Sequence, residues 1–151
     1  YLGRDYPQEW PLDLGPPVHM SFSDSAHYAL DTDLGRAEWN ASLPRGGATV
    51  RLGGARRPFT VGMFHQVRCL DILRETYAAY YADDSPGATV PPPARAMARH
   101  CMNYVRQMVL CRADLRLENA RTDMGNRKAE SEVTHTCRDW SAVYAAAEEN
   151  Y

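Results

Sequence analysis

The 151-residue chain lacks the features of several large protein classes. It has no apolar run near the ~18 residues that a membrane-spanning helix needs, so residues 1–151 do not cross a bilayer. Its net charge of -2 argues against a nucleic-acid binder that is held by phosphate contacts. No internal repeat is present, and the composition is not that of a collagen, a coiled coil or a disordered chain. With 44% hydrophobic and 24% charged residues, we expect one globular domain over 1–151.

Several catalytic signatures are also absent from the sequence. There is no Gly-x-Ser-x-Gly nucleophile turn, no phosphate-binding loop and no glycine motif for a dinucleotide. No Cys-x-x-Cys pair occurs, which disfavours a zinc ribbon or a thioredoxin-type site. The chemistry therefore has to come from other residues.

The four cysteines that are present indicate disulfides. Cys69, Cys101, Cys111 and Cys137 form an even set, which is typical of proteins in an oxidising compartment. Four cysteines allow three connectivities, and the simplest one joins Cys69 to Cys101 and Cys111 to Cys137. Asn40 begins an Asn-Ala-Ser sequon for N-glycosylation. Together these features favour a lumenal or extracellular location.

Residues 1–60 form a segment with little regular patterning. Six prolines and two glycine pairs interrupt it, and short extended pieces are expected at 18–22 and 49–52. Its large apolar residues are too sparse for a separate domain, so we expect an irregular arm that packs over the rest of the protein. The expected anchors of this arm are Trp10, Phe22, Tyr28, Leu30 and Trp39.

Residues 61–118 carry the clearest helical pattern. Apolar residues that recur every three or four positions predict one helix over 61–82 and a second over 94–118. The link between them is short, so the helices should be antiparallel neighbours. The predicted buried stripes are Phe64, Val67, Leu70, Leu73, Tyr77 and Tyr80 in the first helix, and Met97, Cys101, Tyr104, Met108, Cys111 and Leu115 in the second. Asp71 and Glu75 are expected on the solvated surface.

The remaining residues, 119–151, are expected to form a loop and a closing helix. The loop covers 119–132, and the helix covers 141–149 with Asp139 as its N-terminal cap. The predicted fold is therefore mainly α: an antiparallel helical hairpin with a long irregular N-terminal arm packed on it, pinned by disulfides.

The two predicted helices place candidate ligands at their interface. His65 and Cys69 share a face of the first helix, and Met97 and His100 share a face of the second. Antiparallel pairing would bring His65 and His100 together, and two imidazoles with a thioether are a donor set for copper. The alternative is that the histidines are satisfied polar groups and the methionines fill the core. His135 is a further candidate ligand.

An ordered set of motifs resembles a known family. These motifs are Phe64–Leu70, similar to a degraded His-Gln-Leu-His-Cys-Leu, then His100–Gln107, Cys111–Asp114 and His135–Trp140, with Ser25–Tyr28 and Glu38–Gly47 upstream. In this order they resemble the UstYa-like family of fungal mycotoxin and natural-product biosynthesis. The resemblance covers nearly the whole chain.

The resemblance implies a setting and an activity. Members of that family carry an N-terminal membrane helix before this region, so it implies a protein in the secretory-pathway lumen, anchored through a removed N-terminal helix. They tailor small-molecule or peptide natural products, mostly by oxidation, and two His-x-x-His-Cys motifs are thought to bind copper. Some work in pairs, which implies a homodimer or a heterodimer with a related member.

The sequence departs from the family pattern at the expected copper ligands. Arg68 replaces the second histidine of the first motif, and Met97 replaces the first histidine of the second motif. The loss of two imidazoles should lower copper affinity unless Met97 or His135 substitutes, and the charge of Arg68 opposes a cation. A guanidinium can instead hold a carboxylate or an enolate oxygen, while His65 on the same face acts as acid or base.

Three functions follow from these residues. The favoured one is a ring-forming tailoring enzyme that works by redox-neutral acid/base or pericyclic chemistry without a cofactor, with His65, Arg68 and His100 as catalytic residues. The first alternative is a copper-dependent oxidative cyclase, oxidase or hydroxylase, with copper on His65, His100 and either Met97 or His135. The second alternative is a catalytically dead partner subunit of an active relative.

Overall fold

Helices dominate the fold, as the sequence predicts. The computed structural model of the protein describes residues 1–22, 25–82, 90–117 and 134–151, so the expected loop over 119–132 lies entirely outside the described residues. Helices account for 48% of the described residues, in line with a mainly α fold. In chain order the elements are β1 (Val18–Ser21), α1 (Asp33–Ala41), β2 (Thr49–Leu52), β3 (Arg57–Thr60), α2 (Gly62–Tyr81), α3 (Pro92–Arg112), β4 (Thr134–Cys137) and α4 (Trp140–Asn150). Among the described residues, no helix has the length and hydrophobicity that a membrane crossing requires.

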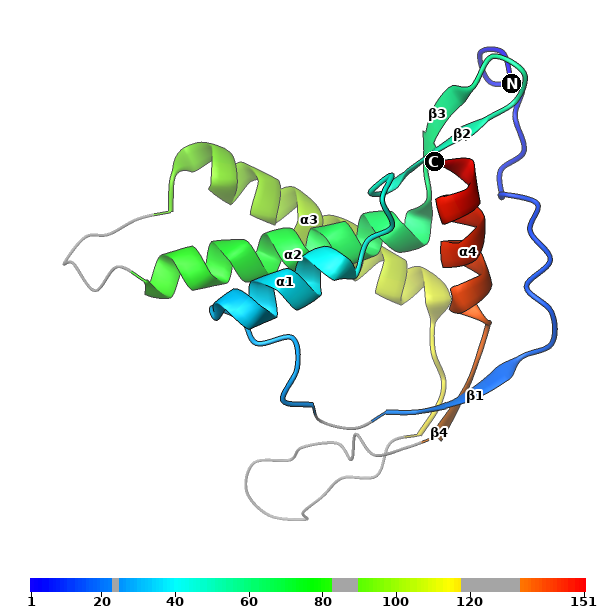
Figure 1. The fold of residues 1–151 in the computed structure, drawn as a ribbon. Coiled ribbons are helices and arrows are strands. Elements are labelled where there is room, and N and C mark those ends of the chain that lie inside the picture. The colour runs from blue at the N-terminus through cyan, green and yellow to red at the C-terminus, as the bar shows by residue number, and fades with distance from the viewer. Residues whose placement is uncertain (23–24, 83–89, 118–133) are drawn as a thin grey trace.

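Helices α2 and α3 form the predicted antiparallel hairpin and run side by side (Figure 1). Helix α2 matches its expected bounds to within one residue. Helix α3 begins at Pro92, because proline suits the first turn, where its missing N–H costs nothing. It ends at Arg112 and not at Glu118, since Ala113 adopts a left-handed conformation with φ of 44° and its N–H donates to the Val109 carbonyl. The expected second helix was therefore too long.

The buried faces of the hairpin differ from the predicted stripes. Phe64 and Cys101 are buried as expected, but Asp71 and Arg74 are buried as well. Several stripe residues are instead exposed: Leu70, Tyr77, Tyr80, Met97, Cys111 and Leu115. Periodicity shows which side chains share a helix face, but not how far neighbouring elements cover that face.

The N-terminal arm contains a helix, α1, that the sequence did not reveal. Thr32 caps it by accepting a hydrogen bond from the Gly35 N–H at 3.0 Å. Gly35 is buried, and a Cβ at this position would lie 2.1 Å from the Ala29 carbonyl oxygen. Glycine is therefore needed where the backbone at Ala29 approaches α1. Because glycine has a weak helix propensity, the sequence did not predict this helix.

Two small antiparallel sheets tie distant segments together. Strand β1 pairs with β4, so that Val18 lies opposite Cys137 and Ser21 opposite Thr134. Strands β2 and β3 form a hairpin in which Thr49 lies opposite Thr60 and Leu52 lies opposite Arg57. The extended pieces expected at 18–22 and 49–52 are confirmed, whereas their partner strands were not predicted.

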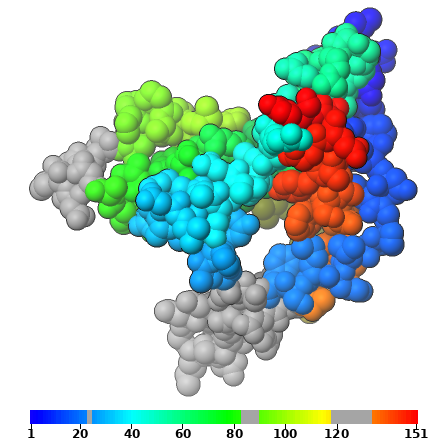
Figure 2. All heavy atoms as spheres, in the orientation of Figure 1, coloured from blue at the N-terminus to red at the C-terminus, as the bar shows by residue number. Residues whose placement is uncertain are grey.

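The hydrophobic core lies where β2, α2 and α4 meet. Its buried members are Val50, Phe64 and Ala147, and Trp10 of the arm packs against them. Figure 2 shows the arm running beside the C-terminal helix. Trp10 is thus an anchor, whereas three of the other expected anchors, Phe22, Tyr28 and Leu30, are exposed. Asp139 caps α4 through the Ser141 N–H, as predicted.

Candidate active site

Three aromatic side chains meet at the interface of α2 and α3. The His65 ring from α2 stacks on the Tyr104 ring from α3, with centroids 4.1 Å apart and planes inclined by 25°. The ring centroids of His65 and His100 are 6.2 Å apart, with planes inclined by 26°. His100 and Tyr104 are four residues apart on one face of α3, and their ring planes are nearly parallel at 6°. The antiparallel hairpin thus brings the two helical histidines together.

Two cysteines lie beside this aromatic group in the hairpin interior. Cys69 and Cys101 are each 1% exposed, and their side chains approach to 2.8 Å. Burial, followed by the hydrogen bond with Cys101, raises the pKa of Cys69 to about 12. Burial also raises the pKa of Tyr104, and the nearby Cys69 adds to this. The thiol and the phenol are therefore neutral near neutral pH, and neither is an activated nucleophile.

The predicted disulfides are not present in the structure. Cys69, Cys101, Cys111 and Cys137 all belong to the described residues and are free thiols. The Cys69–Cys101 approach of 2.8 Å is longer than the ~2.05 Å of a disulfide bond. The hairpin nevertheless places this predicted pair face to face. Cys111 is exposed and Cys137 is half-buried.

Arg68 belongs to a charged network on α2. Its Nη1 donates to Asp71 Oδ2 at 2.7 Å, while its side chain is 44% exposed. The other carboxylate oxygen of Asp71 accepts from both Nε and Nη2 of Arg74, at 2.9 and 2.8 Å. Arg74 also donates to the Leu30 carbonyl at 2.9 Å, which ties α2 to the segment before α1. Asp71 is thus a buried anchor and not the solvated residue that was expected, although Arg-x-x-Asp-x-x-Arg spacing was a visible signal for it.

A large cavity borders the aromatic group on the side of the arm. It has a volume of about 980 Å³ and is lined by the arm, β2, β3 and α4 together with residues of α2 and α3. Gly62 and Gln66 of α2 and Met108 of α3 belong to its lining, and a Cβ on Gly62 would be 4.0 Å from the Tyr104 hydroxyl. Among the described residues, the two imidazoles are not part of the lining. Tyr104 is not part of the lining either, so the cavity lies beside the aromatic group and is not lined by its rings.

Comparison with known proteins identifies the family. A family model described as Mycotoxin biosynthesis protein UstYa matches residues 18–150. The chain belongs to the UstYa family. The resemblance seen in the sequence motifs is thereby confirmed.

Characterised relatives of the UstYa family resemble part of this chain. The Oxidase ustYa of Aspergillus flavus is 33% identical over 91 residues, which are 60% of this chain and 40% of that protein. The UstYa family oxidase phomYb of Diaporthe leptostromiformis is 31% identical over 91 residues, which are 60% of this chain and 34% of that protein. The matched segments thus span less than half of the length of these relatives. No solved structure matches the chain.

The other candidate copper ligands, Met97 and His135, lie in different surroundings from the histidine pair. The described residues contain no group of three His, Cys, Asp or Glu side chains placed for a metal ion. Met97 is half-exposed on α3. His135 lies on β4, where its ring packs on Phe22 at 4.5 Å and hydrogen-bonds with Arg116. The structure thus brings His65 and His100 together, but shows no contact of Met97 or His135 with them.

The glycosylation candidate is accessible to solvent. Asn40 lies near the end of α1 and is exposed. Its neighbour Ser42 is half-buried, and the Ser42 hydroxyl donates to the Trp39 carbonyl at 2.6 Å.

Proposed function

We propose that this chain is a tailoring enzyme of fungal secondary metabolism that forms or modifies a ring by redox-neutral acid/base chemistry. The observation that carries the proposal is the pair of imidazoles from α2 and α3, 6.2 Å apart, without a third metal-binding group among the described residues. Imidazole is the side chain whose acid and base forms coexist near neutral pH, so two of them can share one proton-transfer cycle. No cofactor is part of the proposal.

The proposed reaction balances without an oxidant. One imidazole removes a proton next to a carbonyl of the substrate, and the negative charge moves to the carbonyl oxygen. The resulting nucleophile adds to an electron-poor carbon of the same molecule, which closes the ring. The second imidazole, in its protonated form, returns a proton to the product. His65 and His100 take these two roles, and Tyr104 packs against them and holds their rings in place.

Arg68 is proposed to stabilise the oxyanion. It follows His65 by three residues, so both side chains leave the same side of α2. Asp71 holds one nitrogen of its guanidinium, and a guanidinium has five N–H donors, so donors remain for a substrate oxygen. The buried carboxylate would thus act as a positioning residue for Arg68.

The bulk of the substrate is proposed to bind in the cavity beside the arm, which lies next to the imidazole pair but is not lined by it. A volume of about 980 Å³ suits a natural product or a short peptide. Its walls are rich in apolar side chains such as Trp10, Phe59 and Val143, and its charged lining residues are two arginines, Arg112 and Arg138, and one acid, Glu9. These features favour a bulky, largely apolar substrate that carries an acidic group. The exposed sequon at Asn40 supports a lumenal setting for the enzyme.

The relatives are named oxidases, which supports a second candidate, an oxidase. The motif resemblance implies copper on His65 and His100 for that candidate. The experiment that separates the two candidates combines metal analysis of the purified protein with an oxygen electrode. The substrate is obtained by deleting the gene in its producing organism and purifying the compound that accumulates. We expect turnover without oxygen uptake, unchanged by a chelator. One equivalent of copper together with substrate-dependent oxygen uptake would overturn the redox-neutral proposal.

A catalytically dead partner subunit is the remaining alternative. In that case the purified chain alone would leave the accumulated compound unchanged, and turnover would need an active relative. We expect turnover by the purified chain alone, because its two imidazoles already face each other across one interface.

A further inference from the structure

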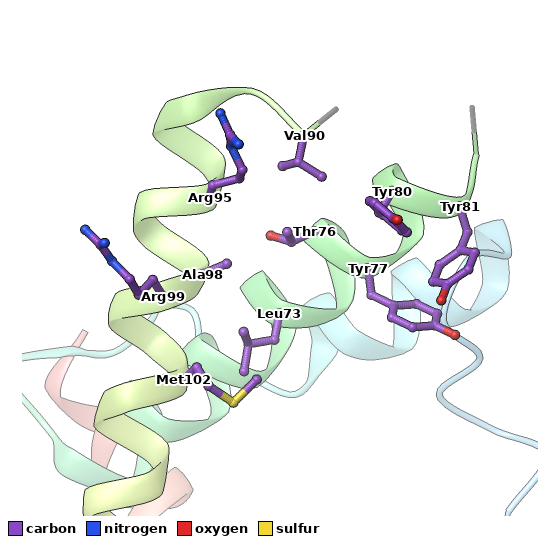
Figure 3. Close-up of a pocket in the computed structure, with 10 residues that line it drawn as sticks. All are labelled: Leu73, Thr76, Tyr77, Tyr80, Tyr81, Val90, Arg95, Ala98, Arg99 and Met102. Carbon is purple, nitrogen blue, oxygen red and sulfur yellow. The ribbon is translucent and has the colours of Figure 1, made fainter. Parts of the chain in front are cut away.

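A second pocket lies on the α2–α3 hairpin, near the C-terminal end of α2. It has a volume of about 570 Å³, which is within the range of small-molecule sites. Leu73, Thr76 and Tyr77 of α2 line one wall, and Ala98 and Met102 of α3 line the other (Figure 3). The two helices thus form a groove with an apolar floor.

Tyrosines supply the aromatic surface of this pocket. Tyr77, Tyr80 and Tyr81 all line it, and each is more than half exposed. The rings of Tyr77 and Tyr81 are 4.5 Å apart, and those of Tyr80 and Tyr81 are 5.1 Å apart with planes inclined by 83°. Such a cluster offers both a ring face and a ring edge to another aromatic ring. Exposed aromatic rings that gather in a groove are typical of a binding site.

Among the residues that the structure describes, the charged side chains that line the pocket are both basic. Arg95 and Arg99 belong to its lining, and the described lining residues include no acidic side chain. The two arginines are four residues apart on α3 and are therefore neighbours on the helix surface. In Figure 3 the side chains of Arg95 and Arg99 leave α3 on the side away from the tyrosines, with their guanidinium groups pointing outward. Exposed arginine side chains change rotamer in nanoseconds, so either can turn toward an anion at the mouth.

This pocket is separate from the two catalytic histidines. Successive residues of a helix are rotated by about 100°, so His100 and Tyr104 lie on a different face of α3 from Arg95, Arg99 and Met102. Cys101 lies between these faces and is buried against Cys69. Neither histidine belongs to the lining of the pocket among the described residues.

We propose that this pocket binds a small planar aromatic acid. The aromatic ring packs against Tyr77, Tyr80 and Tyr81, and the carboxylate pairs with Arg95 and Arg99 at the mouth. The inference goes beyond the proposed function, because it concerns a second site and holds whichever reaction the histidines perform.

Calorimetric titration of the whole chain with 2-naphthoate tests the proposal. We expect saturable binding at one site, weakened about tenfold when the uncharged 2-naphthamide replaces the acid, as for the loss of one charge-assisted contact. The double variant Arg95→Gln/Arg99→Gln should weaken 2-naphthoate binding to a similar extent, and Tyr77→Leu should weaken the binding of both probes. Arg106→Gln, an exposed arginine on the same helix but outside the pocket, is the matched control and should bind like the wild type.

Three results would overturn the proposal. The first is an absence of saturable 2-naphthoate binding, and the second is equal affinity for the acid and the amide; neither depends on a variant that has to fold. The third is a loss of binding in His100→Ala, which would move the ligand to the histidine pair. Far-UV circular dichroism of each variant confirms that the hairpin is intact.

Discussion

The imidazole rings of His65 and His100 face each other across the α2–α3 interface, 6.2 Å apart between centroids. His65 belongs to α2 and His100 to α3. The Tyr104 ring is nearly parallel to that of His100. Packing between the two helices therefore fixes where the rings lie. Such a pair is suited to giving and taking one proton.

Replacement of His100 by alanine should abolish turnover of the compound that accumulates in the deletion strain. Loss of a general acid or base costs roughly 10²–10⁴ in rate, so the product should fall below detection by mass spectrometry. His19→Ala is the matched control, since His19 is exposed on β1 and away from the hairpin interface. Wild-type turnover in His100→Ala would remove the histidine pair from the mechanism.

Substitutions of Arg68 should separate the redox-neutral reaction from the copper-dependent one. Under the redox-neutral mechanism, Arg68→Ala should slow turnover by ~10²–10³, as for the loss of one oxyanion donor. Arg68→Lys should recover part of the rate, because an ammonium keeps the charge but not the planar fork. The measurement is the steady-state rate with and without a chelator.

The opposite outcome for Arg68 is equally specific. If copper is the cofactor, Arg68→His should raise copper affinity and turnover together, and a chelator should abolish both. If neither Arg68→Ala nor Arg68→His changes the rate, the residue serves the Asp71 network alone and has no catalytic role.

Removal of the Asp71 carboxylate should destabilise the fold. Asp71 is 1% exposed and accepts hydrogen bonds from Arg68 and Arg74. Asp71→Ala leaves the buried guanidinium of Arg74 without its anion, and breaking such a pair costs about 3–5 kcal/mol of unfolding free energy. Glu149→Ala, on the exposed side of α4, should change that free energy by less than about 0.5 kcal/mol. Urea denaturation measures both, and equal small effects would show that the network does not stabilise the protein.

Protein isolated from a secretory host should carry a Cys69–Cys101 disulfide. The two side chains already approach to 2.8 Å, so the bond requires little movement of α2 or α3. Closing the chain between these positions should add about 3–4 kcal/mol to the unfolding free energy, which reduction removes. Peptide mapping without reductant identifies the bond, and Cys111→Ala should leave it in place. Recovery of both residues as free thiols would contradict the prediction and the lumenal setting.

In the reduced protein, Cys69 should make stability fall at alkaline pH. Burial raises the pKa of Cys69 to about 12 in the folded state, above that of a thiol in the unfolded chain. The contribution of the neutral Cys69 thiol to the free energy of unfolding is therefore complete below the unfolded-state pKa of ~8.5. It is lost as the pH rises toward 12. Urea unfolding between about pH 7 and pH 11 should show a steeper loss for the wild type than for Cys69→Ala. Parallel curves would mean that the thiol is not desolvated.

Local patterns in the sequence were enough to locate the hairpin and its histidines. The three- and four-residue spacing of apolar side chains predicted α2 to within a residue, and Asp139 marked the start of α4. Helix α1 was missed, because Gly35 lowers its propensity and its need for glycine arises from contact with Ala29. The burial of Asp71 was missed because an aspartate is usually solvated unless it is paired, and the pairing with two arginines was not recognised in the sequence.

By itself, the sequence determined the family, the mainly α class and the antiparallel placement of His65 against His100, because these depend on motif order, periodicity and a short connection. Only the tertiary structure decided which faces are covered and which partners the charged groups find. In the structure Arg68 donates a hydrogen bond to Asp71, Met97 is half-exposed to solvent, and the His135 ring packs on Phe22. The physical reason is that side-chain contacts depend on the distance and rotation between elements, which a periodic pattern along one element does not contain.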